Sequence, residues 1–300
     1  AFLFVGQFLC NFLYETPLVQ INMNKIKNYL IISLLFLSLG FSQKEYNYNH
    51  IIEMDNGLWT EKFSEKPITG RVYKKFGEKN NLKKVYFGNL LNGEKKGRWT
   101  IWYKNGKKKS ERLYKNGKED GLSKKWYENG RKEFEGTFKN GKEDGLTTTW
   151  YENGRKEFEG TFKNGKDDGL NTQWYENGQK KQEGTFKNRE DGLVTLWFEN
   201  GQKESEINHK DGKFDGLWTD WYENGKKQSE TNYKNGKEDG LVTHWYENGQ
   251  KSGEVTYKDG KPDGLYTVWY QNGLKQYEVP FKDGKLISRK DWNRDGSVKE

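Results

Sequence analysis

The sequence predicts an all-β fold, an elongated and twisted antiparallel stack of β-hairpin repeats with a period of 24 residues. A tryptophan recurs at nearly constant spacing, Asn-Gly pairs separate segments rich in β-branched and aromatic residues, and glycine is too frequent for helices. Composition agrees, because 32% of the residues are charged and only 32% hydrophobic, yet 16% are aromatic. Such a chain is expected to build thin local cores from rings, since a disordered chain is poor in aromatic residues.

The repeat is defined by its tryptophans, which are 24 residues apart except for one step of 23. Each is followed by Tyr or Phe and then, two residues later, by Asn-Gly. A glutamate occupies one fixed position of every repeat, and three residues beyond it comes an aromatic residue or His209. The tryptophans are Trp102, Trp126, Trp150, Trp174, Trp197, Trp221, Trp245 and Trp269. The glutamates are Glu111, Glu135, Glu159, Glu183, Glu206, Glu230, Glu254 and Glu278.

Two turns divide each repeat into two strands. A two-residue type I′ turn at Asn153–Gly154 is expected, because Asn and Gly tolerate the positive φ that this turn requires. It places Thr149 opposite Phe158, Trp150 opposite Glu157, and Tyr151 opposite Lys156. A second turn, such as Lys139-Asn140-Gly141-Lys142, joins one repeat to the next, and an Asp-Gly-Leu string follows it.

Side chains alternate between the two faces of a strand, so the register assigns each residue to a face. We expect Trp150, Thr148 and Leu146 on one face, and Tyr151, Phe158, Gly160 and Phe162 on the other. An even repeat length returns every tryptophan to the same face. The step of 23 residues preserves this parity, because the missing residue is lost from the turn between Phe186 and Asp191.

Charge and cysteine content narrow the class of protein. The formal net charge is +8, but Lys alternates with Asp and Glu throughout instead of forming a basic patch or tail. No nucleic-acid partner is therefore expected. The single cysteine, Cys10, allows neither an internal disulfide nor a thiolate metal site.

The first 42 residues are expected to lie outside the folded repeat region. Residues 23–42 are interpreted as a signal peptide, with Lys25 and Lys27 before an apolar run and Gly40 and Ser42 preceding a cut at Gln43. Residues 1–22 are interpreted as an upstream extension that is not native, the alternative being a membrane-associated segment. The remaining predicted divisions are an irregular N-terminal capping region with degenerate repeats (43–96), about eight hairpin repeats (97–281), and a C-terminal partial repeat (282–300).

The string Trp-Tyr-Glu-Asn-Gly-x-Lys-x-x-Glu-Gly-x-Phe-Lys-Asn-Gly-Lys-x-Asp-Gly resembles the MORN-repeat variant of bacterial proteins, over about residues 55–295. Such proteins are often identified as YwqK-family antitoxins of toxin–antitoxin systems. The resemblance implies a β-hairpin stack and a role in protein interaction. The signal peptide departs from the antitoxin reading, because an antitoxin that neutralises a cytoplasmic toxin should stay inside the cell. Some MORN proteins are associated with phospholipid binding, for which this sequence has no motif.

No catalytic, cofactor-binding or metal site is predicted. His209 stands in the aromatic column as a packing residue, and His244 has no second His or Cys at ligand spacing. An Asp before Gly in each repeat is interpreted as a turn residue, since calcium needs six to eight oxygens and Lys is nearby. A glutamate repeated eight times indicates a structural role, because an active site needs one asymmetric constellation.

The leading hypothesis is an exported, non-enzymatic scaffold whose repeated surface binds another protein or a component of the cell envelope. It would lie in the periplasm, the envelope or the medium, or in the cytoplasm if the signal is not used. The alternatives are an antitoxin and a carbohydrate- or wall-binding module. No cofactor and no small-molecule substrate is expected. The predicted binding surface is the tryptophan row Trp126, Trp150, Trp174, Trp197, Trp221, Trp245 and Trp269.

Overall fold

The structure is a computed structural model that describes residues 43–77, 81–187 and 192–300. The predicted upstream extension and signal peptide, residues 1–42, lie outside the described residues. The fold below is that of the unit Tyr46–Glu300. The described residues contain 26 strands, one short 3-10 helix and no α-helix, which confirms the all-β prediction. None of their helical segments has the length and apolar character needed to cross a membrane.

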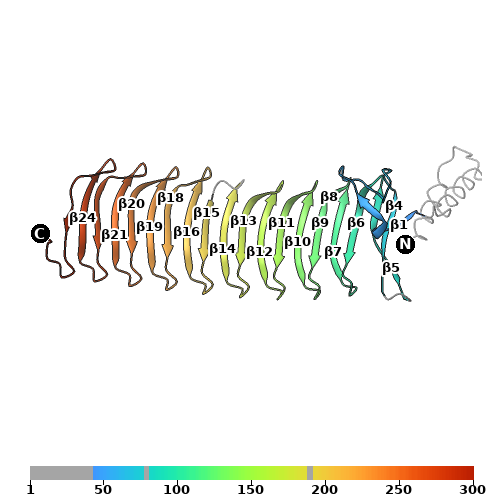
Figure 1. Cartoon of the computed structure of the whole chain (residues 1–300), viewed down its shortest axis with the longest axis horizontal. Coiled ribbons are helices and arrows are strands. Elements are labelled where there is room, and N and C mark those ends of the chain that lie inside the picture. Colours follow the sequence, from blue (N-terminus) through green and yellow to red (C-terminus); the bar gives the residue numbers. More distant parts are fainter. Residues whose placement is uncertain (1–42, 78–80, 188–191) are drawn as a thin grey trace, which may run out of the picture. The chain divides into compact units, whose positions relative to one another are not determined.

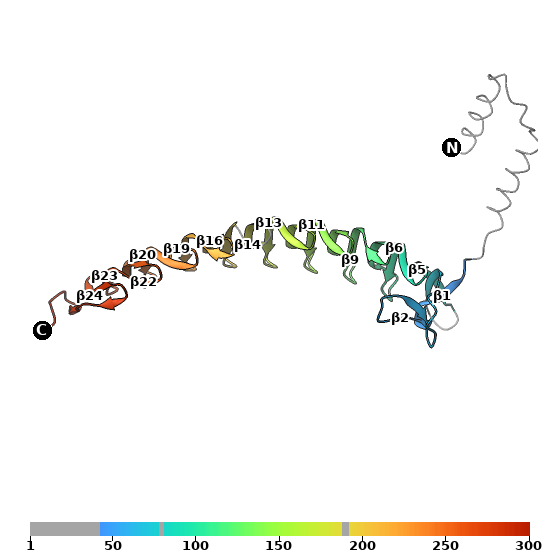
Figure 2. The same cartoon turned by 90° about the horizontal axis from the view of Figure 1, so that it is seen from above.

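Most strands join one long antiparallel sheet. Twenty-four of them belong to it, and β2 and β3 form a separate two-stranded sheet. Neighbours in the chain are neighbours in the sheet, so the strands from β4 to β24 stand in a single row in chain order (Figure 1). Seen from above, the row remains one layer deep, and β2 lies near its β5 end (Figure 2). Each repeat therefore contacts chiefly the repeats beside it.

The N-terminal part precedes the regular repeats and contains both sheets. Its elements are β1 (Glu45–Asn47), η1 (Tyr48–His50), β2 (Ile51–Glu53), β3 (Trp59–Glu61), β4 (Gly70–Phe76) and β5 (Lys83–Leu91). The backbone amide of Trp59 donates to the carbonyl of Gly93 at 2.9 Å, which joins the small sheet to the turn that follows β5.

Each repeat consists of a strand that ends at tryptophan and a strand that begins and ends at lysine. The strands that end at tryptophan, with the short strands that precede some of them, are β6 (Glu94–Trp102), β8 (Lys118–Glu119), β9 (Gly121–Trp126), β11 (Lys142–Trp150), β13 (Lys166–Trp174), β15 (Gly192–Trp197), β17 (Lys213–Phe214), β18 (Gly216–Trp221), β20 (Lys237–Trp245), β22 (Lys261–Pro262) and β23 (Gly264–Trp269). The lysine-bounded strands are β7 (Lys108–Lys115), β10 (Lys132–Lys139), β12 (Lys156–Lys163), β14 (Lys180–Lys187), β16 (Lys203–Lys210), β19 (Lys227–Lys234), β21 (Lys251–Lys258) and β24 (Lys275–Lys282). The row ends with β25 (Lys285–Leu286) and β26 (Lys290–Asp291).

The predicted two-residue turn after tryptophan is wrong. The amide of Tyr151 donates to the carbonyl of Arg155 at 2.9 Å, so the loop contains three residues, and Gly154 alone has positive φ, at 92°. The amide of Gly154 donates back to the carbonyl of Tyr151 at 2.8 Å, as expected for a β-turn closed by a glycine bulge. The sequence rule failed because both turns of the repeat contain Asn-Gly.

The register beyond this loop is partly as predicted. Thr149 lies opposite Phe158, which confirms that pair. Trp150 lies opposite Lys156 and not Glu157, because Glu157 is the extra residue of a β-bulge. The longer loop and the bulge compensate for one another, so the predicted faces hold for Trp150, Thr148 and Leu146 and for Phe158, Gly160 and Phe162.

The type I′ geometry occurs instead at the turn that joins consecutive repeats. Asn140 and Gly141 have φ of 51° and 81°, and Lys139 pairs with Lys142 across them. The Asp-Gly-Leu string that follows is a bulge inside the strand and not a turn, with Gly145 at φ 125°. The carboxylate of Asp144 accepts from the amide of Asn164 at 3.3 Å and thus caps the turn of the following repeat. The equivalent bond is made by Asp120, Asp215 and Asp239.

The shortened repeat keeps its faces. The turn that lost a residue includes 188–191, outside the described residues. On either side of it Glu183 lies opposite Thr195, in the same relation as Glu159 to Thr172 one repeat earlier. This register confirms that the missing residue does not flip the strands that follow.

Large apolar side chains are concentrated at the N-terminal end. Its core consists of Tyr46, Ile51, Trp59, Ile68, Val72, Phe87, Leu90 and Trp99. Most of the residues buried within the repeats are small and polar, such as Ser123, Thr147 and Thr148. The N-terminal region was predicted only as an irregular cap, yet it holds the largest apolar cluster of the described chain.

Candidate functional site

One face of the sheet, here called the tryptophan face, repeats the same side chains from one end to the other. In one repeat the ammonium of Lys156 pairs with Glu159 at 2.6 Å and lies 5.6 Å from the ring centre of Trp174. Thr148 donates to the same glutamate at 3.3 Å. In an equivalent pair the hydrogen bond from Lys132 holds the pKa of Glu135 below its usual value. The predicted structural role of the glutamate column agrees with these contacts.

The predicted binding residues form a row on this face. Trp126, Trp150, Trp174, Trp197, Trp221, Trp245 and Trp269 are all half-buried. A lysine from the preceding repeat lies over each ring, at 5.3 to 5.9 Å from its centre. The rings thus link successive repeats through cation–π contacts. Binding of a partner by this row stays a prediction.

The tryptophan face also carries an exposed leucine row that the sequence analysis did not single out. Leu146 and Leu170 are 56% and 54% exposed. The row comprises Leu122, Leu146, Leu170, Leu193, Leu217, Leu241 and Leu265. Beside it, each described type I′ turn between two of the regular repeats sets two lysines directly opposite one another, as Lys163 faces Lys166. Like charges in this relation are unfavourable, so this edge is strongly basic without an internal partner for every ammonium.

The loop edge of the sheet locks each repeat to the next. The hydroxyl of Tyr151 donates to the carbonyl of Trp174 at 2.7 Å, and the side-chain amide of Asn153 donates to the carbonyl of Glu176 at 3.1 Å. The same two bonds recur along the row and reach into the C-terminal segment, where Tyr270 donates to the carbonyl of Trp292. These contacts join residues 22 or 23 positions apart, so turn rules based on local sequence do not reveal them.

One repeat lacks the tyrosine bond, which provides a matched pair of variants. Phe198 occupies the position of Tyr151. Tyr151→Phe should lower the free energy of unfolding by about 1 kcal/mol, and Phe198→Tyr should raise it by a similar amount through a new bond to the Trp221 carbonyl. Urea unfolding followed by circular dichroism measures both. Equal destabilisation by the two changes would show that the hydroxyl bond does not hold the repeats together.

Several tyrosines make the fold sensitive to alkali. Burial, and then the neighbouring glutamates, raise the pKa of Tyr127 and Tyr151, while burial and a hydrogen bond with Tyr277 raise that of Tyr266 to about 12. A group whose pKa is higher in the folded protein stabilises it below the unfolded value, here 10.0, and loses that contribution as the pH rises through the folded value. We expect the urea midpoint to be independent of these groups up to about pH 9 and to fall between about pH 10 and 12. A midpoint that stays constant to pH 12 would contradict this assignment.

The opposite face, here called the variable face, changes from repeat to repeat. At the position of Thr147 it carries Trp99, Ser123, Thr147, Asn171, Val194, Trp218, Val242 and Tyr266. At the position of Gly160 it carries Arg112, Gly136, Gly160, Gly184, Ile207, Thr231, Val255 and Val279. At the position of Thr149 it carries Ile101, Lys125, Thr149, Gln173, Leu196, Asp220, His244 and Val268. The tryptophan face therefore carries the same residues in every repeat, whereas the residues of the variable face change from repeat to repeat.

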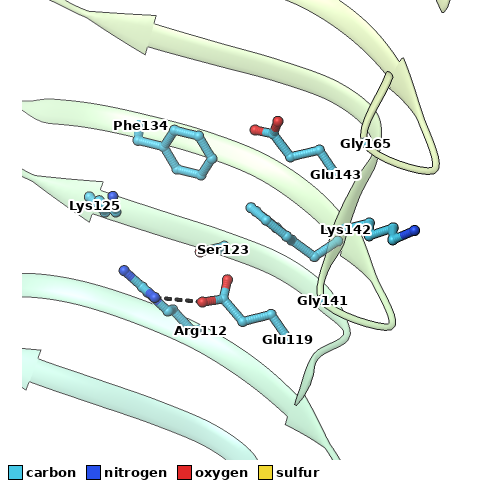
Figure 3. A pocket seen from close by; sticks show the side chains of 10 residues that line it. Arg112, Glu119, Ser123, Lys125, Phe134, Gly141, Lys142, Glu143 and Gly165 are labelled. Atoms are coloured by element: carbon cyan, nitrogen blue, oxygen red, sulfur yellow. Dashed lines mark hydrogen bonds and ion pairs between the residues drawn. The ribbon is translucent and has the colours of Figure 1, made fainter. Parts of the chain in front are cut away.

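A groove of about 480 Å³ opens on the variable face near its N-terminal end. Arg112 and Glu119 form an ion pair at 2.5 Å along one side, and Phe134 and the carboxylate of Glu143 lie across from them (Figure 3). The ammonium of Lys142 points away from the other labelled side chains (Figure 3). Where the repeats carry glycine at the position of Gly160, an aromatic ring two residues away fills the space, since a Cβ built on Gly160 would lie 2.5 Å from the ring of Phe158.

The sequence profile of the MORN repeat variant family matches eight segments of this sheet, at residues 95–116, 119–140, 143–164, 167–188, 190–211, 214–235, 238–259 and 262–283. The chain belongs to the MORN repeat variant family. Each matched segment contains one tryptophan-ended strand, its loop and the following lysine-bounded strand, so the family unit is one hairpin. No curated protein matches the chain significantly. Repeats of this family generally act as non-catalytic scaffolds and are associated with protein or membrane binding.

The MORN repeats contain two histidines, His209 and His244, which lie in different surroundings. No group of three or more His, Cys, Asp or Glu suited to a metal ion occurs among the described residues. His209 packs against Phe214 with ring centres 5.0 Å apart, in agreement with its predicted packing role. His244 is exposed. The geometry of the described residues thus offers extended surfaces for recognition.

Proposed function

We propose that this chain is an exported, non-enzymatic MORN-repeat scaffold that binds a protein partner through its variable face. The contrast between the two faces carries the proposal. The lysine and glutamate columns of the tryptophan face pair with one another, and that face is uniform from repeat to repeat. On the variable face most residues at the positions of Thr147 and Gly160 are buried, whereas the aromatic column and the residues at the position of Thr149 are half-buried or exposed. The residues at the position of Thr149 occur in an order found once, so they can match one partner in one register. Aromatic residues like those of the aromatic column are enriched in binding hot spots.

The test introduces the same residue on each face of the same two repeats. Thr149→Arg with Gln173→Arg alters the variable face, and Leu146→Arg with Leu170→Arg alters the tryptophan face. The partner is first captured from an envelope fraction with residues 43–300 as bait, and its affinity for each variant is then measured. We expect the first pair to weaken binding at least about tenfold, equivalent to about 1.4 kcal/mol, and the second pair to leave it unchanged. The reverse result would assign binding to the tryptophan face.

Export is part of the proposal and is supported by sequence alone. Lys25 and Lys27, the apolar run that follows, and the small residues Gly40 and Ser42 have the order of a cleavable signal. The intact mass of the protein produced in a bacterial host with a secretion system should correspond to a chain that begins at Gln43. A cytoplasmic product that retains Met23 would contradict export and would favour the antitoxin alternative.

A second candidate function, adhesion to a membrane surface, is favoured by the leucine row with its flanking lysine pairs. Apolar side chains beside basic ones suit the interface of an anionic bilayer. Co-sedimentation with phosphatidylglycerol vesicles would measure it, with phosphatidylcholine vesicles as the control. Lys139→Glu with Lys142→Glu should abolish sedimentation if this candidate is right. The carbohydrate alternative finds less support, because lysines already cover the tryptophan rings.

A further inference from the structure

The variable face contains one dense aromatic cluster, formed by β16, β17, β18 and β19. It consists of His209, Phe214, Trp218 and Tyr233. Phe214 lies at its centre, with ring-centre distances of 5.0 Å to His209, 4.9 Å to Trp218 and 5.5 Å to Tyr233. All four rings are half-buried, so each keeps part of its surface open to solvent.

A carboxylate is held in place beside these rings. Asp220 accepts from the indole Nε1 of Trp218 at 2.7 Å and from the hydroxyls of Ser205 and Ser229, each at 2.7 Å. The hydroxyl of Ser205 is also 3.0 Å from the same indole nitrogen. Three neutral donors orient the carboxylate without neutralising it, and about one of its four lone-pair sites remains for a further donor.

No cation of the described chain reaches this cluster. The described residues form no ion pair with Asp220, and none of their lysines or arginines lies over the rings of Phe214, Trp218 or Tyr233. The tryptophan face offers the contrast, because a lysine covers each ring of its row. Burial first, and then the charges of Glu238 and Asp220, raise the pKa of Tyr233, as expected where the local potential is negative.

The surroundings extend this negative character. In a chain of net charge +8, the variable face carries carboxylates opposite its aromatic column, because directly paired residues share a face. These are Glu119 opposite Tyr114, Glu143 opposite Phe138, Asp167 opposite Phe162, and Glu238 opposite Tyr233. The face is thus complementary to a basic protein surface.

We infer that the Asp220 cluster is the anchor site for an arginine side chain of the protein partner. The guanidinium lies over the rings of Trp218 and Tyr233 and donates to the free lone pair of Asp220. A cation within about 6 Å of an aromatic ring is attracted by it, most strongly by tryptophan. Arginine suits the site better than lysine, because its planar group stacks on rings and donates from a fixed fork. This inference rests on the proposed function, of which it specifies the partner's chemistry.

The experiment uses residues 43–300 labelled with ¹⁵N and follows the indole resonance of Trp218, assigned by its loss in Trp218→Phe. The probe is a capped Gly-Ser peptide with one central arginine, and the control probe carries citrulline, which has the same shape without the charge. We expect the arginine peptide to shift the Trp218 indole in a saturable way, with an affinity at least about tenfold above that of the citrulline peptide. Equal responses to the two peptides would overturn the inference.

Asp220→Asn supplies the second arm, since its amide oxygen can still accept from the indole and from Ser205, its NH2 can donate to the hydroxyl of Ser229, and the charge is removed. It should weaken arginine binding at least about tenfold. Asp239→Asn, a carboxylate one residue from Glu238 that accepts from the backbone of Asp259, should leave it unchanged. An unaltered affinity in Asp220→Asn would overturn the inference. The arginine peptide could bind as expected while the variant Thr149→Arg with Gln173→Arg still binds the protein partner normally. That result would contradict the proposed function but would still support an arginine site at Asp220.

Discussion

Deletion of residues 143–166, one complete repeat, should leave a folded protein that unfolds cooperatively. The deletion joins Lys142 to Asp167, which occupies the position of Glu143 one repeat later, so the type I′ turn and both faces are preserved. Stability in a repeat stack is roughly a sum of repeat and neighbour terms, so the midpoint of thermal unfolding should change by only about 5 °C. Circular dichroism and tryptophan fluorescence together measure the transition.

The contrasting deletion removes residues 153–163, which include the whole of β12. The deletion removes one lysine-bounded strand from a sheet in which tryptophan-ended and lysine-bounded strands alternate. Because the deleted segment has an odd number of residues, the side chains that follow it also point to the opposite face of the sheet. We expect loss of the cooperative transition and exposure of the tryptophans. If the two deletions unfold the protein to the same extent, the repeats are not independent modules.

Leu90→Ala should cost about 2 to 5 kcal/mol in the free energy of unfolding, the range measured when large side chains are removed from a packed core. Leu90 is 1% exposed and belongs to the N-terminal apolar cluster. Leu146→Ala provides the control, because Leu146 is 56% exposed and its truncation should change stability by less than about 0.5 kcal/mol. Urea unfolding at equilibrium compares them.

Hydrogen exchange locates the effect. The amides of β4 and β5 should lose protection in Leu90→Ala, while those of β20 and β21 keep theirs, since neighbouring repeats alone are coupled. Equal costs for the two leucine variants would show that the N-terminal cluster does not stabilise the end of the row.

Much of the fold is predictable from the sequence, because side-chain alternation converts a regular spacing directly into a shared face. The tryptophan row, the glutamate column and the preserved parity after Gly184 all follow from counting residues. The loop after tryptophan does not, because Asn-Gly occurs in both turns of the repeat and the side chain of Asn153 ties its loop to Glu176 in the next repeat. Turn rules consider only residues within the turn, so they assigned type I′ geometry to the wrong Asn-Gly.

The candidate site was less accessible to sequence reasoning. The tryptophan row was predicted as the binding surface because its residues recur in every repeat. The variable face is instead defined by the residues that differ between repeats. Asp220 occupies a position at which the other repeats carry neutral side chains or Lys125, and Trp218 one at which most carry small side chains. A comparison of the residues at equivalent positions of the repeats identifies both Asp220 and Trp218 as unusual. The contact of Asp220 with Ser229 lies in the predicted register, because this pair is equivalent to Thr149 and Phe158. The contact with Ser205 crosses from one repeat to the next, where the register depends on a bulge that was not predicted.

The loop edge determines how the row would respond to a mechanical load. The strands stand across the row, so tension between its two ends separates neighbouring strands one hydrogen bond at a time (Figure 1). Because most loops are tied to the next by a tyrosine and an asparagine, release of one of these repeats requires those two bonds to break together. A released repeat of 24 residues extends to at most about 80 Å, in place of the roughly 10 Å that it occupies as two strands. A chain held at both ends would therefore lengthen in equal steps, as a tether that absorbs sudden force.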